Sequence, residues 1–145
     1  MTWIDIRDSI TKLISSKLKI KVYSENIDKV EKPCFFINLI DYKKEFDSQN
    51  RELKTIQIDI DYRSKTLSKN ANAEIYTALE NLDNAFDREG RKILKVGDRF
   101  LTLKNTDMAI VDSVGHYVFT ISLYDLYGEL ADYEPMGEIS FDYRR

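Results

Sequence analysis

The chain contains few of the residues from which most catalytic and metal sites are built. Its 145 residues include one cysteine, Cys34, and one histidine, His116. A single cysteine cannot form an internal disulfide or a zinc site made of several cysteines. Cys34 and His116 are one candidate nucleophile and base, but Cys34 follows Pro33 in an aromatic run, which favours a buried and inert thiol. We therefore expect no catalytic residue.

Glycine is equally scarce, and its spacing excludes two phosphate-binding motifs. The five glycines lie far apart, at Gly90, Gly97, Gly115, Gly128 and Gly137. The P-loop and the dinucleotide-binding loop both need several glycines within one short turn. We therefore expect no bound nucleotide, and the residues indicate no other cofactor.

Long apolar runs and a surplus of basic charge are also absent. No run approaches the roughly 18 to 20 apolar residues that span a bilayer, and the N-terminus, MTWIDIRDSI, lacks the basic start and apolar segment of a signal peptide. The net charge of -3 and the pI near 5.3 argue against binding to duplex DNA. With 43% hydrophobic and 12% aromatic residues, the chain is typical of one folded domain made in a cytoplasm, with no membrane partner.

Apolar residues at helical spacing predict two helices. Thr2 and Asp5 have capping-box spacing, and the apolar pattern after them predicts a first helix over about residues 3 to 17. Four large apolar residues recur at the same spacing further along the chain, at Ile75, Leu79, Leu82 and Phe86. They predict a second helix that ends at Gly90, since glycine is a common C-terminal cap.

The remaining apolar patterns are typical of strands. Alternating or continuous apolar segments predict strands at residues 19–24, 34–42, 55–63, 93–96, 100–103, 108–111 and 116–127. Segment 34–42 is apolar on both faces, which predicts a central strand covered from both sides. Segment 43–51 is rich in charge and turn-forming residues, which predicts a long hairpin loop or the tip of a hairpin. The order α-β-β-β-α-β-β-β-β predicts an α+β fold, with two helices packed on a largely antiparallel sheet.

The segment TIQIDIDYR, residues 55–63, places Asp59 and Asp61 side by side on the polar face of a strand. Two neighbouring carboxylates can hold a metal, act as an acid/base pair, or make a surface negative. Calcium needs six to eight oxygen ligands, usually supplied by a loop, and no spacing in the sequence predicts that Asp41, Asp83, Asp87 or Asp125 approaches this pair. We expect a solvated strand face, with no metal and no catalytic role.

Residues 129–145 form a C-terminal extension that differs from residues 1–128. Within it Ile139, Phe141 and Tyr143 alternate with polar residues. This alternation predicts a strand for which the rest of the chain leaves no partner. An exposed terminal strand is suited to pairing with a sheet edge on another subunit.

An amphipathic N-terminal helix is followed by four segments in an informative order, VYSE (22–25), PCFFI (33–37), IDIDY (58–62) and HYVFTISLY (116–124). In this order they resemble the small tail terminator proteins of long-tailed phages and phage-tail-like bacteriocins. The resemblance runs from about residue 3 to residue 127, so residues 1–128 would form the tail-terminator-like domain. Residues 129–145 match it least.

The resemblance implies a structural virion protein and no enzyme. Such proteins form a homo-oligomeric ring, usually a hexamer, that caps the tail tube and stops further tube subunits from adding. The ring offers a surface to the neck or head, and in contractile tails it also contacts the sheath. The implied location is the virion tail, or a tail-like particle, assembled in the cytoplasm of the bacterial host.

In such a ring, the polar face of residues 55–63 has two candidate placements. If it lines the lumen, six copies of Asp59 and Asp61 would place about twelve carboxylates around the channel, and DNA would pass without specific binding. If it faces outward or towards a neighbour, the same aspartates would pair with lysine or arginine. Residues Ile139, Phe141 and Tyr143 are the expected contacts to a neighbouring subunit or to the sheath.

Two rival functions remain open from the sequence. A head-tail connector or tail completion protein would share the ring and the lack of chemistry. A small cytoplasmic metal-dependent enzyme would use Asp59 and Asp61, and substitution of Asp59 would then abolish its activity. A regulator or single-strand binder is disfavoured by the acidic charge.

Overall fold

The computed structural model describes residues 1–24, 30–48, 50–65 and 71–126. The elements are α1 (Trp3–Lys17), β1 (Lys21–Tyr23), β2 (Cys34–Ser48), β3 (Arg51–Arg63), α2 (Ala71–Ala85), β4 (Asp87–Arg88), β5 (Arg91–Val96), β6 (Arg99–Val111) and β7 (Val114–Leu126). The predicted α+β class and the element order are confirmed. Among the described segments, no helix is both long and apolar enough to cross a membrane.

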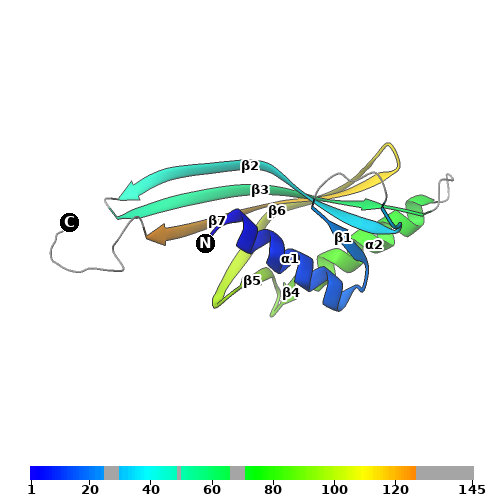
Figure 1. Ribbon diagram of the computed structural model, residues 1–145, viewed down its shortest axis with the longest axis horizontal. Coiled ribbons are helices and arrows are strands. Elements are labelled where there is room, and N and C mark those ends of the chain that lie inside the picture. Colours follow the sequence, from blue (N-terminus) through cyan, green and yellow to red (C-terminus); the bar gives the residue numbers. More distant parts are fainter. Residues whose placement is uncertain (25–29, 49, 66–70, 127–145) are drawn as a thin grey trace.

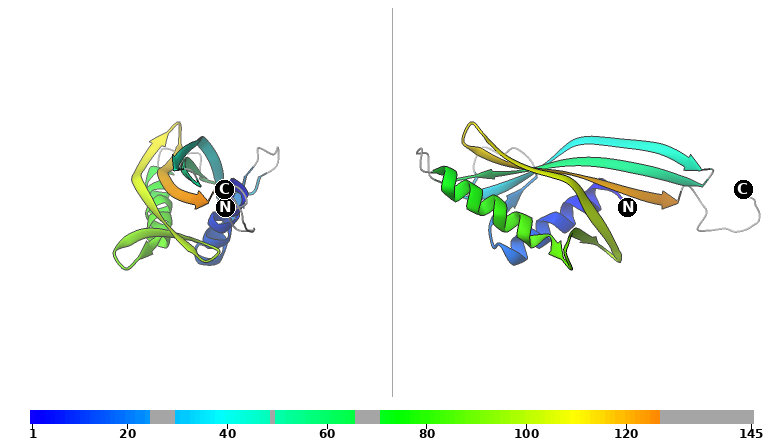
Figure 2. Two further views of the ribbon diagram at one scale, coloured as in Figure 1. Left: turned by 90° about the vertical axis from the view of Figure 1, so that its left-hand side faces the viewer. Right: turned by 180° about the vertical axis from the view of Figure 1, so that it is seen from behind.

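The strands form one seven-stranded sheet in the order β1-β2-β3-β7-β6-β5-β4. Only the β1–β2 pair is parallel, so the prediction of a largely antiparallel sheet is confirmed. Both helices lie on the same side of the sheet, as Figures 1 and 2 show. Neither of the described helices lies on the other side, which we call the helix-free face. Beyond the helices, β2, β3 and β7 extend together as a long ribbon (Figure 1).

The core lies between the helices and the facing side of the sheet. The fully buried side chains of the helices include Ile6, Ile10, Ile14, Ile75, Leu79 and Leu82, and those of the strands include Ile56, Ile58, Ile60, Tyr117, Phe119 and Ile121. Burial of each large apolar side chain contributes about 1.5 to 3 kcal/mol. Alternation along β3 and β7 supplies the sheet side of this core, because successive strand side chains point to opposite faces. The capping box of Thr2 and Asp5 is present at the start of α1.

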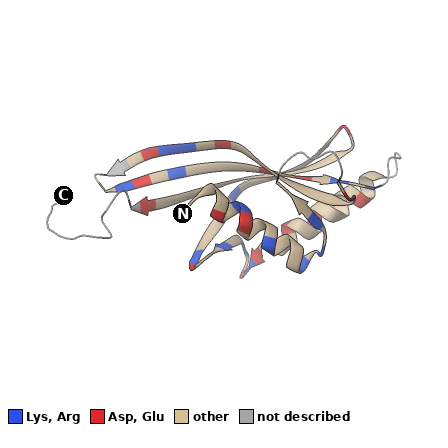
Figure 3. Cartoon of the chain, viewed as in Figure 1, with Lys and Arg blue, Asp and Glu red and all other residues tan. Residues whose placement is uncertain are grey.

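The prediction of a long loop at residues 43–51 is wrong, but the alternative, that the segment contains the tip of a hairpin, is confirmed because Ser48 pairs with Arg51. β2 continues to Ser48 and β3 begins at Arg51, so most of this segment is paired strand. Figure 3 shows basic and acidic residues close together along these protruding strand ends. Charge and turn-forming residues are typical of loops, but they occur equally in a strand whose faces are both open to solvent. The polar residues of this segment therefore reflect its exposure to solvent and do not indicate a loop.

Three other sequence predictions also need correction. The second helix ends at Ala85, and Gly90, with a φ of 78°, lies in the turn between β4 and β5. Residues 108–111 are not a separate strand but continue β6 past an irregularity between Lys104 and Asp107. The strand at 34–42 is covered on both sides only at its start, since Leu39 is 39% exposed.

A buried ion network ties the N-terminus to the ribbon on the helix side of the sheet. The Lys54 ammonium is 2.8 Å from Asp125 Oδ2, and it donates a hydrogen bond of 2.8 Å to the Met1 carbonyl. Asp125 Oδ1 in turn accepts from Arg99 at 2.6 Å. Burial disfavours the charged form of Asp125, but the hydrogen bonds from Lys54 and Arg99 outweigh it and hold the pKa of Asp125 below its usual range.

Candidate functional site

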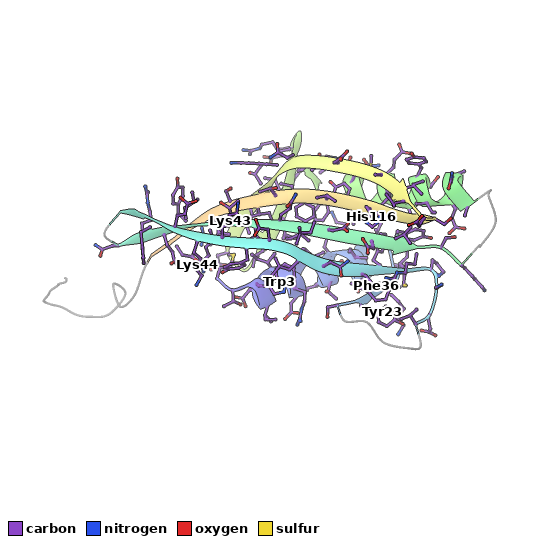
Figure 4. The ribbon with its side chains drawn as sticks, turned by 90° about the horizontal axis from the view of Figure 1, so that it is seen from above. Trp3, Tyr23, Phe36, Lys43, Lys44 and His116 are labelled. Atoms are coloured by element: carbon purple, nitrogen blue, oxygen red, sulfur yellow. The ribbon has the colours of Figure 1, made fainter. Side chains whose placement is uncertain are left out.

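The helix-free face carries a polar cluster where β2, β3 and β7 lie side by side. Cross-strand register places Asp61 between Phe36 of β2 and His116 of β7. Asp59 lies two residues before Asp61 and therefore on the same face. We call Asp59, Asp61, His116 and Asn38 the carboxylate–histidine cluster. Figure 4 looks down on this face, with His116 and Phe36 labelled.

One imidazole nitrogen joins the two carboxylates. His116 Nδ1 lies 3.0 Å from Asp59 Oδ2 and 2.8 Å from Asp61 Oδ1. Asn38 donates a 3.1 Å hydrogen bond from Nδ2 to Asp61 Oδ2. The hydrogen bond of Nδ1 is to Asp59. Among the described residues, the buried Asp61 Oδ1 has no hydrogen-bond partner, although Nδ1 lies close to it. The imidazole nitrogen thus lies between the two carboxylates and within 3.0 Å of both.

The expectation of a solvated strand face is wrong for Asp61. This residue is only 8% exposed, and the Asp59 side chain is 16% exposed. Asn38 of β2 and His116 of β7 both contact the Asp61 carboxylate. Sequence alternation correctly put both aspartates on one face, but it missed His116 and Asn38, which come from strands distant in the chain. Whether this face lines a lumen stays a prediction.

Burial and mutual repulsion shift the protonation of the cluster. Burial, followed by the hydrogen bond and charge of Asp59, raises the pKa of Asp61 to about 6. For His116, burial opposes the imidazolium, but the hydrogen bond to Asp59 and the charges of both carboxylates outweigh it and raise the pKa of His116. The cluster therefore holds its protons more tightly than isolated side chains do.

The cluster has part of the chemistry of a metal site. Asp59, Asp61 and His116 can each offer one ligand atom, and these atoms lie within 4.8 Å of one another. Three protein ligands are enough for zinc with water in the fourth position, but they fall short of the six to eight oxygens that calcium takes. In this arrangement the imidazole Nδ1 already lies between the two carboxylates, 3.0 Å from Asp59 and 2.8 Å from Asp61.

Replacing Asp61 by asparagine is expected to flatten the dependence of stability on pH. Because the folded-state pKa values of Asp61 and His116 are both raised, each stabilises the fold fully below its unfolded pKa and loses that contribution as pH rises. The Asp61 contribution is lost between about pH 4 and pH 6. Between pH 4.5 and pH 7.5, the wild-type protein should lose about 2 kcal/mol more unfolding free energy than Asp61→Asn, after discounting for residual solvent. Urea unfolding at both pH values measures this difference, and parallel profiles would contradict it.

Two further sequence predictions concern Cys34 and the C-terminal arm, residues 129–145. Cys34 is fully buried, as predicted, and burial raises the pKa of its thiol. The Arg63 guanidinium lies 4.1 Å from the centre of the neighbouring Phe36 ring. The predicted contact residues Ile139, Phe141 and Tyr143 lie outside the described residues.

Comparison with known proteins identifies one family. A family profile described as phage tail terminator protein matches residues 5–131. A comparison with curated proteins finds no match. One similar solved structure is 14% identical in sequence, with 89% of this chain and 98% of that chain covered and a TM-score of 0.41. Similarity at that level carries no conclusion about function.

Proposed function

We propose that this chain, which belongs to the phage tail terminator protein family, forms a ring that caps the finished tail tube. Membership of the family makes it a structural protein of the phage tail. In the proposed assembly, six copies close the ring and stop further tube subunits from adding. The ring then offers a surface to the neck or head and, in a contractile tail, to the last sheath layer. It would be assembled in the cytoplasm of the bacterial host.

The family match is the observation that carries this proposal. It runs from residue 5 to residue 131 and so includes both helices almost completely and every strand from β1 to β7. The fold supports it, since one face of the sheet is covered by helices and the other is left for contact or for a channel (Figure 2). The proposed role is structural and involves no turnover of a substrate.

Lining of the lumen by Asp59 and Asp61 remains part of the proposal, with one addition from the geometry. His116 lies between the two carboxylates, so each copy would present a partly neutralised cluster to the channel. The channel wall would become more negative as pH rises through the raised pKa of His116. A partly neutralised wall would repel DNA weakly, and weak repulsion favours sliding of the DNA through the channel over binding to its wall. A map of the assembled ring with this cluster far from the bore would remove the lumen placement.

Deleting residues 129–145 is expected to leave residues 1–128 folded and to weaken assembly. If the arm contacts only neighbouring molecules, the free energy of unfolding should change by no more than about 0.5 kcal/mol. If Ile139, Phe141 and Tyr143 contact a neighbour or the sheath, the truncated protein should need at least about tenfold more protein to assemble. Urea unfolding and sedimentation measure the two effects. An unfolded truncated protein would instead assign the arm to the core of the domain.

Mass measurement combined with electron microscopy tests the proposed function. Purified protein is mixed with tail tubes, and the expected result is a closed oligomer at one end of each tube that blocks extension by tube subunits. Binding at the head end of a finished tail without any effect on tube length would favour a connector or tail completion protein. A protein that stays monomeric and ignores the tubes, or that turns over a substrate, would overturn the proposal.

A further inference from the structure

We propose that neighbouring copies join edge to edge, the β2 edge of one copy pairing with the β6 edge of the next. This inference rests on the proposed ring and adds the contact that closes it. Both edges are long, exposed and complementary in charge within the described part of the chain. The contact uses different surfaces on its two sides, as a closed ring requires.

Each of these strands has an open edge over most of its length. β1 pairs only with Cys34–Phe36, so none of the described strands covers the outer edge of β2 beyond Phe36. β5 pairs with β6 only from Arg99 to Thr102, so the described strands likewise leave β6 open from Leu103 to Val111. An open edge presents a row of backbone donors and acceptors that favours pairing with another strand.

Exposed apolar side chains accompany both open edges. On β2, Leu39 is 39% exposed and Ile40 is 51% exposed, and on β6, Met108 is 38% exposed and Val111 is 54% exposed. Apolar residues on an open edge favour association with a second edge.

The strand directions suit a ring. β2 and β6 are separated by three antiparallel steps, through β3 and β7, so they run in opposite directions. In a ring whose axis lies roughly along the strands, every copy keeps the same strand direction. The β2 strand of one copy would therefore meet the β6 strand of the next in antiparallel pairing, which continues the pattern of the sheet.

One register pairs opposite charges at two positions. If Lys43 of one copy lies opposite Asp107 of the next, Glu45 comes opposite Lys104. The step of two residues on β2 matches a step of three residues on β6, because β6 carries an extra residue between Lys104 and Asp107. Its pairing with β7 shifts by one there.

All four charged side chains then lie on the same face of the combined sheet. Lys43 pairs with Thr55 and Glu45 with Leu53, both on the helix-free side of β3. Lys104 and Asp107 pair with residues of β7 on that side too, since they lie opposite Thr120 and Val118. The backbone register therefore places all four charged side chains on the helix-free face.

The helix side of the same register carries two apolar pairs, with Lys44 beside them opposite the bulge of β6. Tyr42 would lie opposite Met108, and Leu39 opposite Ile110 once the bulge at Ile40 is allowed for. Apolar and oppositely charged cross-strand pairs each favour a particular register. Two charge pairs and two apolar pairs therefore agree on one alignment of the edges.

Cysteine cross-linking tests the contact directly. Within one chain, β2 and β6 are three strand spacings apart, roughly 14 Å, which is beyond the limit of about 7 Å between Cα atoms in a disulfide. A Lys43→Cys and Asp107→Cys double variant can therefore cross-link only between copies. Under mild oxidation it should form a ladder of multimers up to the full ring. Each single variant is the matched control and should stop at dimers, while native Cys34 is buried and should not react.

A charge swap at the second pair is the independent test. Glu45→Lys and Lys104→Glu should each place like charges opposite one another and weaken assembly about tenfold per interface. The double variant should restore assembly to near the wild-type concentration, because the pair is re-formed with its signs exchanged. A merely structural effect of either substitution would not be rescued by the other.

Different outcomes would contradict the contact between β2 and β6 and the proposed capping function on which it rests. If rings cap tubes normally, yet the double cysteine variant gives no ladder and the charge variants assemble like wild type, the function stands and the edge contact is wrong. If the cysteine and charge variants have no effect but deletion of residues 129–145 abolishes assembly, the arm pairs with the open edge of the neighbouring copy instead. If no oligomer forms under any condition, both proposals fall together.

Discussion

Replacing Lys54 by methionine is expected to lower the free energy of unfolding by about 3 kcal/mol. The Lys54 side chain is 9% exposed and lies between Asp125 and the Met1 carbonyl. Methionine fills a similar volume but leaves the buried carboxylate without this cation. Asp125 keeps its contact with Arg99, which places the cost at the lower end of the range for a broken buried ion pair. Urea unfolding at neutral pH measures it.

The double variant Lys54→Met with Asp125→Asn separates charge from packing. If the cost comes from the unpaired carboxylate, the double variant should be less destabilised than the sum of the two single variants. Lys12→Met is the matched control, because Lys12 is an exposed lysine on α1, and it should change stability by no more than about 0.5 kcal/mol. Additive effects in the double variant would show that the ion pair contributes nothing beyond packing.

Replacing Gly115 by alanine is expected to destabilise the protein by about 2 to 3 kcal/mol. A Cβ atom there would lie 2.5 Å from Ile75 Cγ2 and 3.2 Å from a methyl carbon of Leu79. Both neighbours belong to α2, which packs directly on the β7 backbone at this point. Ile75 is β-branched and stiff in a helix, so it cannot swing aside without moving the helix. Thermal or urea unfolding of Gly115→Ala measures the cost.

A compensating substitution tests whether the clash is the cause. Ile75→Ala removes the atom nearest to the added methyl group, and by itself it should cost about 2 to 5 kcal/mol through the cavity that it leaves. Combined with Gly115→Ala, the total should be clearly less than the sum, since the new methyl group partly fills that cavity. Fully additive losses would place the effect of Gly115→Ala in the backbone and not in the contact with α2.

The sequence predicted only part of the candidate site. Alternation in TIQIDIDYR put Asp59 and Asp61 on one face, and that is where they lie. His116, which contacts both carboxylates, is aligned with Asp61 only through the register between β3 and β7. No spacing within either strand indicates that register, because alternation identifies which face a side chain shares but not which residue lies opposite. The same limit hid Lys54, whose burial depends on Asp125 and on the N-terminus.

The sequence by itself determined the helices, the class of fold and the faces of its strands, because these follow from the spacing of apolar residues along a short stretch of chain. It also determined the family, since that match depends on the order of such stretches. Only the tertiary structure decided that residues 43–48 are strand and not loop, that Asp61 is buried beside His116, and that β2 and β6 expose open edges. Each of these depends on which segments pair across the sheet, and pairing between distant segments leaves no period in the chain.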